Sequence, residues 1–194
     1  MRRVSQITDS HCGPAVIEML LSNVGINATQ AEIALAAGVQ DVIEMHGTRV
    51  DQLALAVRRL APQMQFWYKE HSTLADLEAL VMQHRFPVGV EWQGVFEDEG
   101  EADPEPDYGH YSVVALIDPE AQALIMVDPY HDYVLQDRAF ALDEFNERWW
   151  DNNLVPNPAT GKEELVEDYH MMFIVTPQAS TFPESLAMKR GSSL

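Results

Sequence analysis

The sequence predicts an α+β fold, with helices first along the chain and strands after them. Apolar residues recur at helical spacing over most of residues 12–84, and extended apolar runs dominate residues 87–175. Alternating βαβ units would interleave the two patterns, so this order favours α+β. A length of 194 residues suits one core. We expect residues 1–176 to form a single domain and residues 177–194 a loosely held tail.

The first predicted helix begins at Cys12, after an irregular N-terminal stretch. Pro14 suits its first turn, where the missing N–H costs nothing, and Gly25 suits its C-terminal end. Apolar residues recur along it at helical spacing, so we expect it to be largely buried: Val16, Ile17, Met19, Leu20, Leu21 and Val24.

The next two helices are predicted from their end signals. Thr29 and Glu32 form a capping-box pattern, and Gly38 ends the helix that they begin. We expect Thr48 to cap the following helix and Pro62 to close it.

The remaining expected elements are mostly strands. In order, they are a strand at 66–68, a helix at 73–84, strands at 87–92, 110–117 and 123–128, a helix at 142–150 and a strand at 170–175. Only the short, Pro-containing stretch 118–122 separates the strands at 110–117 and 123–128. These two strands are therefore predicted to pair as a hairpin.

Composition and charge restrict the possible partners. The net charge of −19 repels phosphate backbones and anionic membranes, so nucleic-acid binding is not expected, whereas a basic peptide or protein would be attracted. No run of 18 apolar residues suggests a membrane span, and the N-terminus lacks the apolar region of a secretory signal, so we expect a cytoplasmic protein. The single cysteine excludes an intramolecular disulfide and a CxxC metal site.

Four residues suggest nucleophilic chemistry. Cys12 lies at a helix N-terminus, where the dipole and the free N–H groups favour a thiolate. A thiol nucleophile needs a base and an orienting group. His110 opens one strand of the predicted hairpin and Asp128 ends the other, so the two are expected to meet. Gln6 is close enough to donate to an oxyanion together with the Cys12 backbone N–H.

At these residues the sequence resembles the bacteriocin-processing peptidases and their stand-alone relatives within the papain-like superfamily. The family pattern has a Gln upstream of a Cys-Gly pair that opens a helix, then a Gly-His before a hydrophobic strand, and an Asp-Pro that closes the next strand. The matching residues here are Gln6, Cys12–Ala15, Gly109–Tyr111 and Asp128–Pro129. The resemblance extends over about residues 4–176.

The resemblance implies a papain-like fold in which an N-terminal helical half carries Cys12 and packs on an antiparallel sheet carrying His110 and Asp128. It implies a cysteine peptidase or related hydrolase that cleaves a peptide bond through a Cys12 thioester, with no metal or other cofactor. The substrate would be a peptide or protein. His11 stands where the family usually has an acid, and no transporter domain follows. The resemblance therefore predicts the fold and the triad of this chain better than it predicts the substrate.

Other interpretations remain open. The same triad could transfer an acyl group to an acceptor other than water, or the domain could be a catalytically silent peptide-binding module. Cys12, His110 and Asp128 could bind zinc, although the paired short-range ligands usual for zinc are missing. Residues 97–107 are strongly acidic but lack the ligand spacing of an EF-hand, so we expect a solvated loop there.

Overall fold

The computed structural model describes residues 1–96, 109–156 and 159–193, so the acidic segment 97–107 lies outside the described residues. In chain order the elements are α1 (Cys12–Asn23), α2 (Gln30–Ala37), α3 (Ile43–His46), α4 (Val50–Leu60), β1 (Met64–Lys69), α5 (Leu74–Glu78), the π-helix η1 (Ala79–Gln83), β2 (Val88–Gln93), β3 (Gly109–Asp118), β4 (Ala123–Val127), β5 (Arg138–Ala141), α6 (Leu142–Arg148), β6 (Trp150–Pro156), β7 (Glu163–Tyr169), β8 (Met172–Pro177), α7 (Phe182–Ser185), β9 (Lys189–Arg190) and the 3₁₀-helix η2 (Gly191–Ser193).

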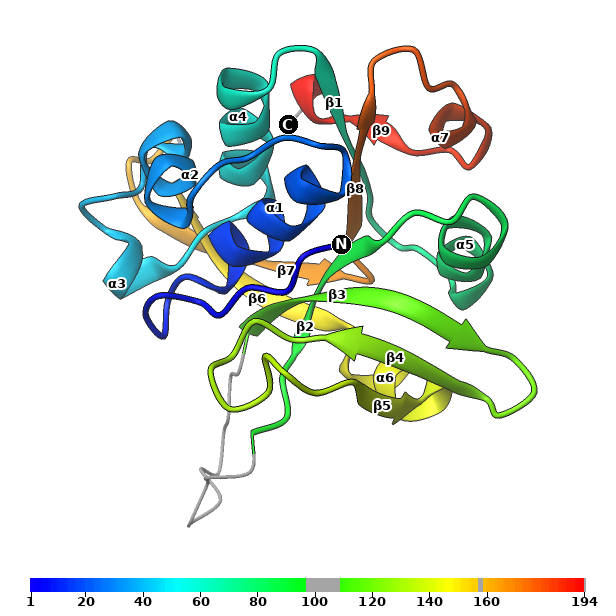
Figure 1. Cartoon of the computed structure of the whole chain (residues 1–194). Helices are drawn as coiled ribbons and strands as arrows, with labels where there is room; N and C mark the ends of the chain where they lie inside the picture. Colours follow the sequence, from blue (N-terminus) through cyan, green and yellow to red (C-terminus); the bar gives the residue numbers. More distant parts are fainter. Residues whose placement is uncertain (97–108, 157–158, 194) are drawn as a thin grey trace.

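A seven-stranded antiparallel sheet is the centre of the fold, with the strand order β5-β4-β3-β2-β8-β1-β9. The helices α1, α2 and α4 lie on one face of it, and the segment α5–η1 and α6 lie on the other (Figure 1). Strands β3 and β4 pair antiparallel, with Val113 opposite Val127. The α+β fold and the predicted hairpin are thus confirmed, and the hairpin brings the start of β3 beside the end of β4.

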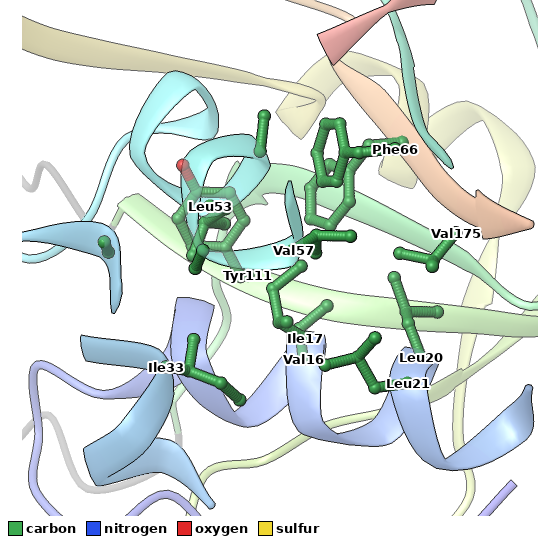
Figure 2. Close-up of a cluster of buried hydrophobic side chains, with 14 of the residues drawn as sticks. Val16, Ile17, Leu20, Leu21, Ile33, Leu53, Val57, Phe66, Tyr111 and Val175 are labelled. Atoms are coloured by element: carbon green, nitrogen blue, oxygen red, sulfur yellow. The ribbon is translucent and has the colours of Figure 1, made fainter. Parts of the chain in front are cut away.

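Two hydrophobic cores form because successive strand residues point to opposite faces of the sheet. On β8, Phe173 and Val175 pack with the α1 side, whereas Met172 and Ile174 pack with the α6 side. Figure 2 shows the first core, in which the inward side chains of α1 meet α4 and the sheet. Ten consecutive residues of α1 are buried, from Cys12 to Leu21, as its apolar pattern predicted. This burial fixes the helix whose first residue is the candidate nucleophile.

Helix α2 has the ends that its sequence predicts. The Thr29 side chain accepts from the backbone N–H of Glu32, and the Glu32 carboxylate accepts from the backbone N–H of Thr29 at 2.8 Å. Gly38 ends the helix in the left-handed conformation, with φ of 80°. Local hydrogen bonding alone sets both ends, which is why the sequence reveals them.

The prediction that Thr48 caps the next helix is wrong. Helix α4 begins at Val50 with Arg49 at its N-cap, and the Arg49 backbone N–H donates to the side chain of Gln52 at 2.9 Å. Thr48 is instead buried against α1, beside Gly13. The local sequence pattern predicted that the Thr48 side chain would cap the helix, but in the folded protein it packs against α1. The helix expected over residues 73–84 is present as α5 followed by η1.

The C-terminal segment differs from the loosely held tail expected from sequence. Strand β9 pairs with β1 at the edge of the sheet, and Met188 is buried in the core on the α6 face. Gly191 approaches helix α4 so closely that an added Cβ would lie 2.8 Å from the Cβ of Ala54. The paired strands β6 and β7, also absent from the predicted elements, form a separate two-stranded sheet. Both features depend on contacts that a short, weakly periodic segment does not reveal.

Candidate active site

Cys12 is the first residue of α1, and its side chain is buried, with 8% of its surface exposed. The next residue, Gly13, lies against Thr48 and Tyr111: an added Cβ would be 2.1 Å from the Thr48 hydroxyl oxygen and 3.3 Å from the Tyr111 ring. Glycine is therefore required for the N-terminus of α1 to approach the sheet this closely. This approach brings the Cys12 thiol to the start of β3.

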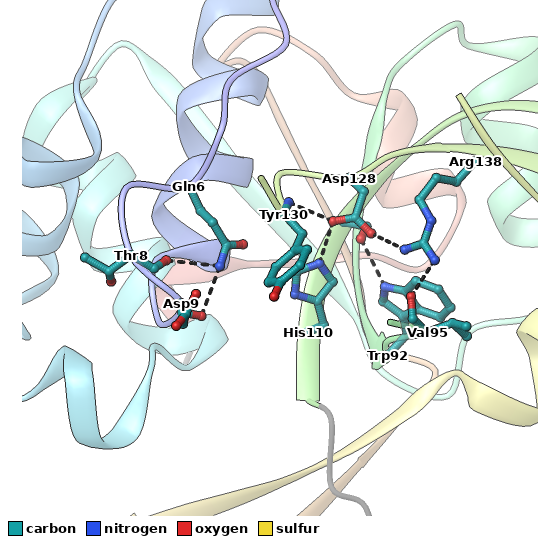
Figure 3. A network of polar contacts seen from close by, with 10 residues as sticks. Gln6, Thr8, Asp9, Trp92, Val95, His110, Asp128, Tyr130 and Arg138 are labelled. Carbon is teal, nitrogen blue, oxygen red and sulfur yellow. Dashed lines mark hydrogen bonds and ion pairs between the residues drawn. The ribbon is translucent and has the colours of Figure 1, made fainter. Parts of the chain in front are cut away.

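His110 lies between Cys12 and Asp128. Its Nε2 donates to Oδ1 of Asp128 at 2.8 Å, and the side chain of Cys12 lies close enough to the imidazole to raise its pKa. Because Nε2 is used by Asp128, Nδ1 is the ring nitrogen available to Cys12. His110 and Asp128 are both buried, at 4% and 0% exposed. Figure 3 shows the imidazole directed at the Asp128 carboxylate.

The charges of this cluster reinforce one another. Burial alone would lower the pKa of His110, but the charge and hydrogen bond of Asp128, with a smaller contribution from Cys12, raise it to about 10. Burial alone would raise the pKa of Asp128, but His110, the Tyr130 backbone N–H and Arg138 lower it to about 2. Near neutral pH, His110 is therefore an imidazolium paired with a carboxylate.

Two donors hold the Asp128 carboxylate in addition to His110. Its Oδ1 also accepts from the backbone N–H of Tyr130 at 2.9 Å, and its Oδ2 accepts from Nη1 of Arg138 at 2.7 Å. The carbonyl of the following residue, Pro129, accepts from the backbone N–H of Gln6 at 2.8 Å. The turn after β4 thus joins Asp128 to the N-terminal segment that carries Gln6.

Gln6 is joined to the turn after β4 through its backbone, but its side-chain amide N–H groups are used within its own loop. Its Nε2 donates to the carbonyls of Thr8 and Asp9, both at 3.0 Å (Figure 3). Its Oε1 is buried and, among the described residues, has no hydrogen-bond partner. A role in an oxyanion hole would require the amide to turn from these carbonyls, so that role stays a prediction.

His11, the neighbour of the candidate nucleophile Cys12, is held by contacts with residues of its own loop and of α3. Its Nδ1 lies 2.6 Å from the Thr8 hydroxyl, and burial lowers its pKa despite the nearby carboxylate of Glu44. These contacts tie the loop before α1 to helix α3. They orient the His11 imidazole toward Thr8, a residue of the same loop.

Three residues near His110 were not found by sequence reasoning. The Phe96 ring packs edge-on against the His110 ring with centroids 5.2 Å apart, and Arg138 binds Asp128. Asp151 lies so close to Gly109 that an added Cβ would be 2.4 Å from its Oδ1. This contact explains physically why glycine precedes the histidine. Only that glycine gave a signal in the sequence.

The described residues, 1–96, 109–156 and 159–193, show no group of three or more His, Cys, Asp or Glu side chains placed to hold a metal ion. Over the same residues, no helix combines the length and apolar character needed to cross a membrane. Cys12, His110 and Asp128 form a linear chain of contacts with the imidazole in the middle. That arrangement suits proton transfer and the stabilisation of a thiolate.

Comparisons with known proteins identify the family and the fold. A family model described as "Peptidase_C39 like family" matches residues 1–153. A similar solved structure is the peptidase domain of Streptococcus ComA, a bi-functional ABC transporter involved in a quorum-sensing pathway, with a TM-score of 0.59 and 18% sequence identity. The match covers 91% of this chain and 98% of that chain. No curated protein matches. The likeness confirms the predicted papain-like fold.

Proposed function

We propose that this chain, which belongs to the Peptidase_C39 like family, is a cysteine peptidase that cleaves a peptide bond through a thioester on Cys12. The observation that carries the proposal is the buried chain of contacts from Asp128 through His110 to Cys12. It would supply a nucleophile, a proton carrier beside it and an orienting carboxylate hydrogen-bonded to that proton carrier.

The protonation of His110 sets the order of steps. With a pKa of about 10, His110 carries a proton at neutral pH, and in the proposed mechanism this imidazolium stabilises the thiolate form of Cys12 when it forms. The thiolate attacks the carbonyl carbon of the scissile bond, giving a tetrahedral intermediate. The C–N bond then breaks as His110 gives its proton to the leaving nitrogen, and an acyl thioester remains on Cys12.

Hydrolysis of the thioester returns the site to its starting state. The neutral His110 takes a proton from a water molecule while that water attacks the thioester carbonyl, and the C–S bond breaks to release the acid. Asp128 keeps Nε2 bonded throughout, so that Nδ1 faces Cys12 and the attacking water. The backbone N–H of Cys12 is a candidate donor to the developing oxyanion, because the first N–H groups of a helix lack partners within it.

The proposed substrate is a peptide or protein segment, preferably a basic one. The chain carries 31 acidic residues against 12 lysines and arginines. A field of this sign raises the encounter rate with cationic peptides and disfavours nucleic acids. Because the field acts on encounter, we expect basic residues to lower KM more than they raise kcat, and more so at low salt.

The test is mass-spectrometric detection of cleavage in a diverse peptide library, with wild type beside Cys12→Ala and Cys12→Ser. We expect cleavage by wild type alone, with circular dichroism and Tm showing that the variants remain folded. Equal cleavage by a folded Cys12→Ala variant would rule out the mechanism.

The same assay distinguishes the alternatives. Product masses identify whether the acyl group is transferred to water or to an added amine, which separates hydrolysis from acyl transfer. A peptidyl aldehyde should form an adduct on Cys12, the single cysteine of the chain. A folded protein that binds peptides but neither cleaves them nor forms the adduct would be a binding module.

A further inference from the structure

We propose that Arg138 is a positioning residue for this site, which holds the Asp128 carboxylate in the orientation that His110 requires by bridging it to the backbone carbonyl of Val95. The proposal rests on the proposed function for its catalytic consequence. It stands on the geometry of three elements: β5, the turn after β4 and the end of β2.

The bridge uses two separate nitrogens of one guanidinium. Nη1 donates to Oδ2 of Asp128 at 2.7 Å, and Nη2 donates to the carbonyl oxygen of Val95. The Arg138 side chain is 10% exposed, and that of Asp128 is 0% exposed. A planar guanidinium fixes the directions of both N–H groups, which a lysine ammonium cannot do. Figure 3 shows Arg138 between the carboxylate and the Val95 carbonyl.

Aromatic rings hold the guanidinium in place. Its Cζ lies 3.8 Å from the centroid of the Tyr133 ring and 5.0 Å from that of Phe140. The backbone of Arg138 is itself in register, opposite Met126 in the β4–β5 pair. Both ends of the side chain are therefore fixed before it meets Asp128, so the bridge requires little further ordering.

The two oxygens of Asp128 have different tasks. Oδ1 accepts from Nε2 of His110 and from the Tyr130 backbone N–H, whereas Oδ2 accepts from Arg138. If Arg138 were shortened, Oδ2 would be buried without this donor, and the carboxylate would gain freedom to rotate away from His110. The charged side chains bonded to Asp128 in the described part of the chain are His110 and Arg138. Losing Arg138 therefore also weakens the preference for the ionised carboxylate.

The experiment compares the full-length wild-type chain with Arg138→Met, Arg138→Lys and Arg3→Met. Arg3 is the matched control, because it pairs with Asp137, the neighbour of Arg138, and also donates to the carbonyl of Gln136. The first readout is the deshielded proton resonance of His110 Nε2–H in proton NMR. The second is the separate determination of kcat and KM across pH, using one peptide cleaved in the library assay.

For Arg138→Met we expect the Nε2–H resonance to shift or broaden, kcat to fall roughly 10- to 100-fold, and KM to stay within about twofold. The acid limb of the kcat profile should move to higher pH, because Asp128 becomes easier to protonate. Arg138→Lys keeps the charge but loses the second N–H direction, so it should fall between wild type and Arg138→Met. Arg3→Met should match wild type in the Nε2–H resonance and in kcat and KM across pH.

A folded Arg138→Met variant with wild-type resonance, kcat and acid limb would overturn the proposal and leave Arg138 a purely structural residue. If Arg138→Met does not fold, Arg138→Lys decides, and wild-type values in that variant would overturn the bridge. Absence of peptide cleavage by wild type would refute the proposed function instead. The NMR readout would then still test the positioning of Asp128.

Discussion

Two buried polar clusters lie side by side on β2 and β3, and they handle buried charge in opposite ways. The charge-matched cluster consists of His110, Asp128 and Arg138. The acid cluster consists of Glu91, Tyr111, Asn153 and Asp151. Trp92 pairs with His110 across the two strands, and the adjacent cross-strand pair is Glu91 with Tyr111, so the clusters start from consecutive pairs.

In the charge-matched cluster, each buried ion has a partner of opposite charge. Asp128 has His110 on one oxygen and Arg138 on the other. In the acid cluster, Oε1 of Glu91 accepts from the Tyr111 hydroxyl at 2.5 Å and from Asn153 at 3.3 Å. Its Oε2 is buried and lacks a hydrogen-bond partner among the described residues.

The pKa shifts follow from these partners. Burial and the neighbouring charge of Asp151 raise the pKa of Glu91 well above its usual value. Asp128, which is 0% exposed against 1% for Glu91, has its pKa lowered to about 2. Depth of burial is similar, so the charges of the partners decide in which direction each pKa moves. The charge-matched cluster therefore favours an ionised carboxylate, whereas the acid cluster favours a protonated one.

The largest expected effect comes from breaking the charge-matched cluster with Asp128→Asn. Loss of the orienting carboxylate should reduce kcat by about 10³- to 10⁴-fold. It should also lower the free energy of unfolding by about 3–5 kcal/mol, because Arg138 is left buried without its anion. Steady-state kinetics and urea unfolding measure the two effects.

Asp118→Asn is the control for this substitution. Asp118 lies at the other end of β3, where its carboxylate accepts from the turn N–H groups of Glu120 and Ala121. It should lose no more than about 1 kcal/mol of stability, as for an exposed capping contact, with kcat unchanged. If Asp128→Asn kept more than roughly a tenth of wild-type kcat, Asp128 would not be the orienting group.

A smaller effect is expected at Gly109, where the two clusters meet. An added Cβ would lie 2.4 Å from Oδ1 of Asp151, so Gly109→Ala should push the start of β3 from its place. We expect a loss of about 1–3 kcal/mol in unfolding free energy and reduced activity, because His110 is the next residue.

The double variant Gly109→Ala/Asp151→Ala sharpens this prediction. Removing the Asp151 carboxylate makes room for the methyl group, so Gly109→Ala should cost less stability in the Asp151→Ala background than in wild type. Urea unfolding of the four proteins in the cycle gives the coupling energy. Equal losses in both backgrounds would show that the close approach to Asp151 does not explain the glycine.

The smallest effect is expected from Glu91→Gln, and it should depend on pH. A carboxyl whose folded pKa lies above its unfolded value stabilises the fold at low pH and loses that contribution as pH rises past the unfolded value. Glutamine removes this dependence while keeping the acceptor for Tyr111. The variant should therefore resemble wild type near pH 4 and gain on the order of 1 kcal/mol by pH 8.

Thermal unfolding of both proteins from pH 4 to pH 9 measures the difference. Glu167→Gln is the control, because Glu167 lies on the exposed strand β7, where its carboxylate accepts from the Tyr169 hydroxyl. A Glu91→Gln variant that loses stability as pH rises, as wild type does, would contradict a neutral Glu91.

The charge-matched cluster could be predicted from the sequence only in part, because only some of its contacts are set by residues that are close together in the chain. Cys12 at a helix start depends on an adjacent apolar pattern, and His110 and Asp128 meet because a short turn joins their strands. Arg138 lies ten residues beyond Asp128 and reaches it across a loop. No local period or turn length signals such a contact.

The acid cluster was not predicted at all, because it assembles from distant segments. Asn153 reaches Glu91 from β6, a strand without a clear alternating pattern in the sequence. Thr48 is the opposite case, in which a local pattern gave a wrong prediction. The pattern predicted a helix cap, but the Thr48 side chain is buried against α1 instead. Local sequence patterns identify helices, strands and their ends, whereas tertiary contacts decide which polar side chains form the buried clusters.

The most direct test of the account is the pH dependence of Cys12 alkylation by iodoacetamide in wild type and in His110→Ala. Since Cys12 is the single cysteine, intact-mass labelling reports on it alone. If His110 holds the thiolate as an ion pair, wild type should react rapidly well below the pH range of an ordinary thiol, and His110→Ala should follow a free-thiol profile. Identical profiles for the two proteins would contradict the Cys12–His110 pair and the peptidase mechanism built on it.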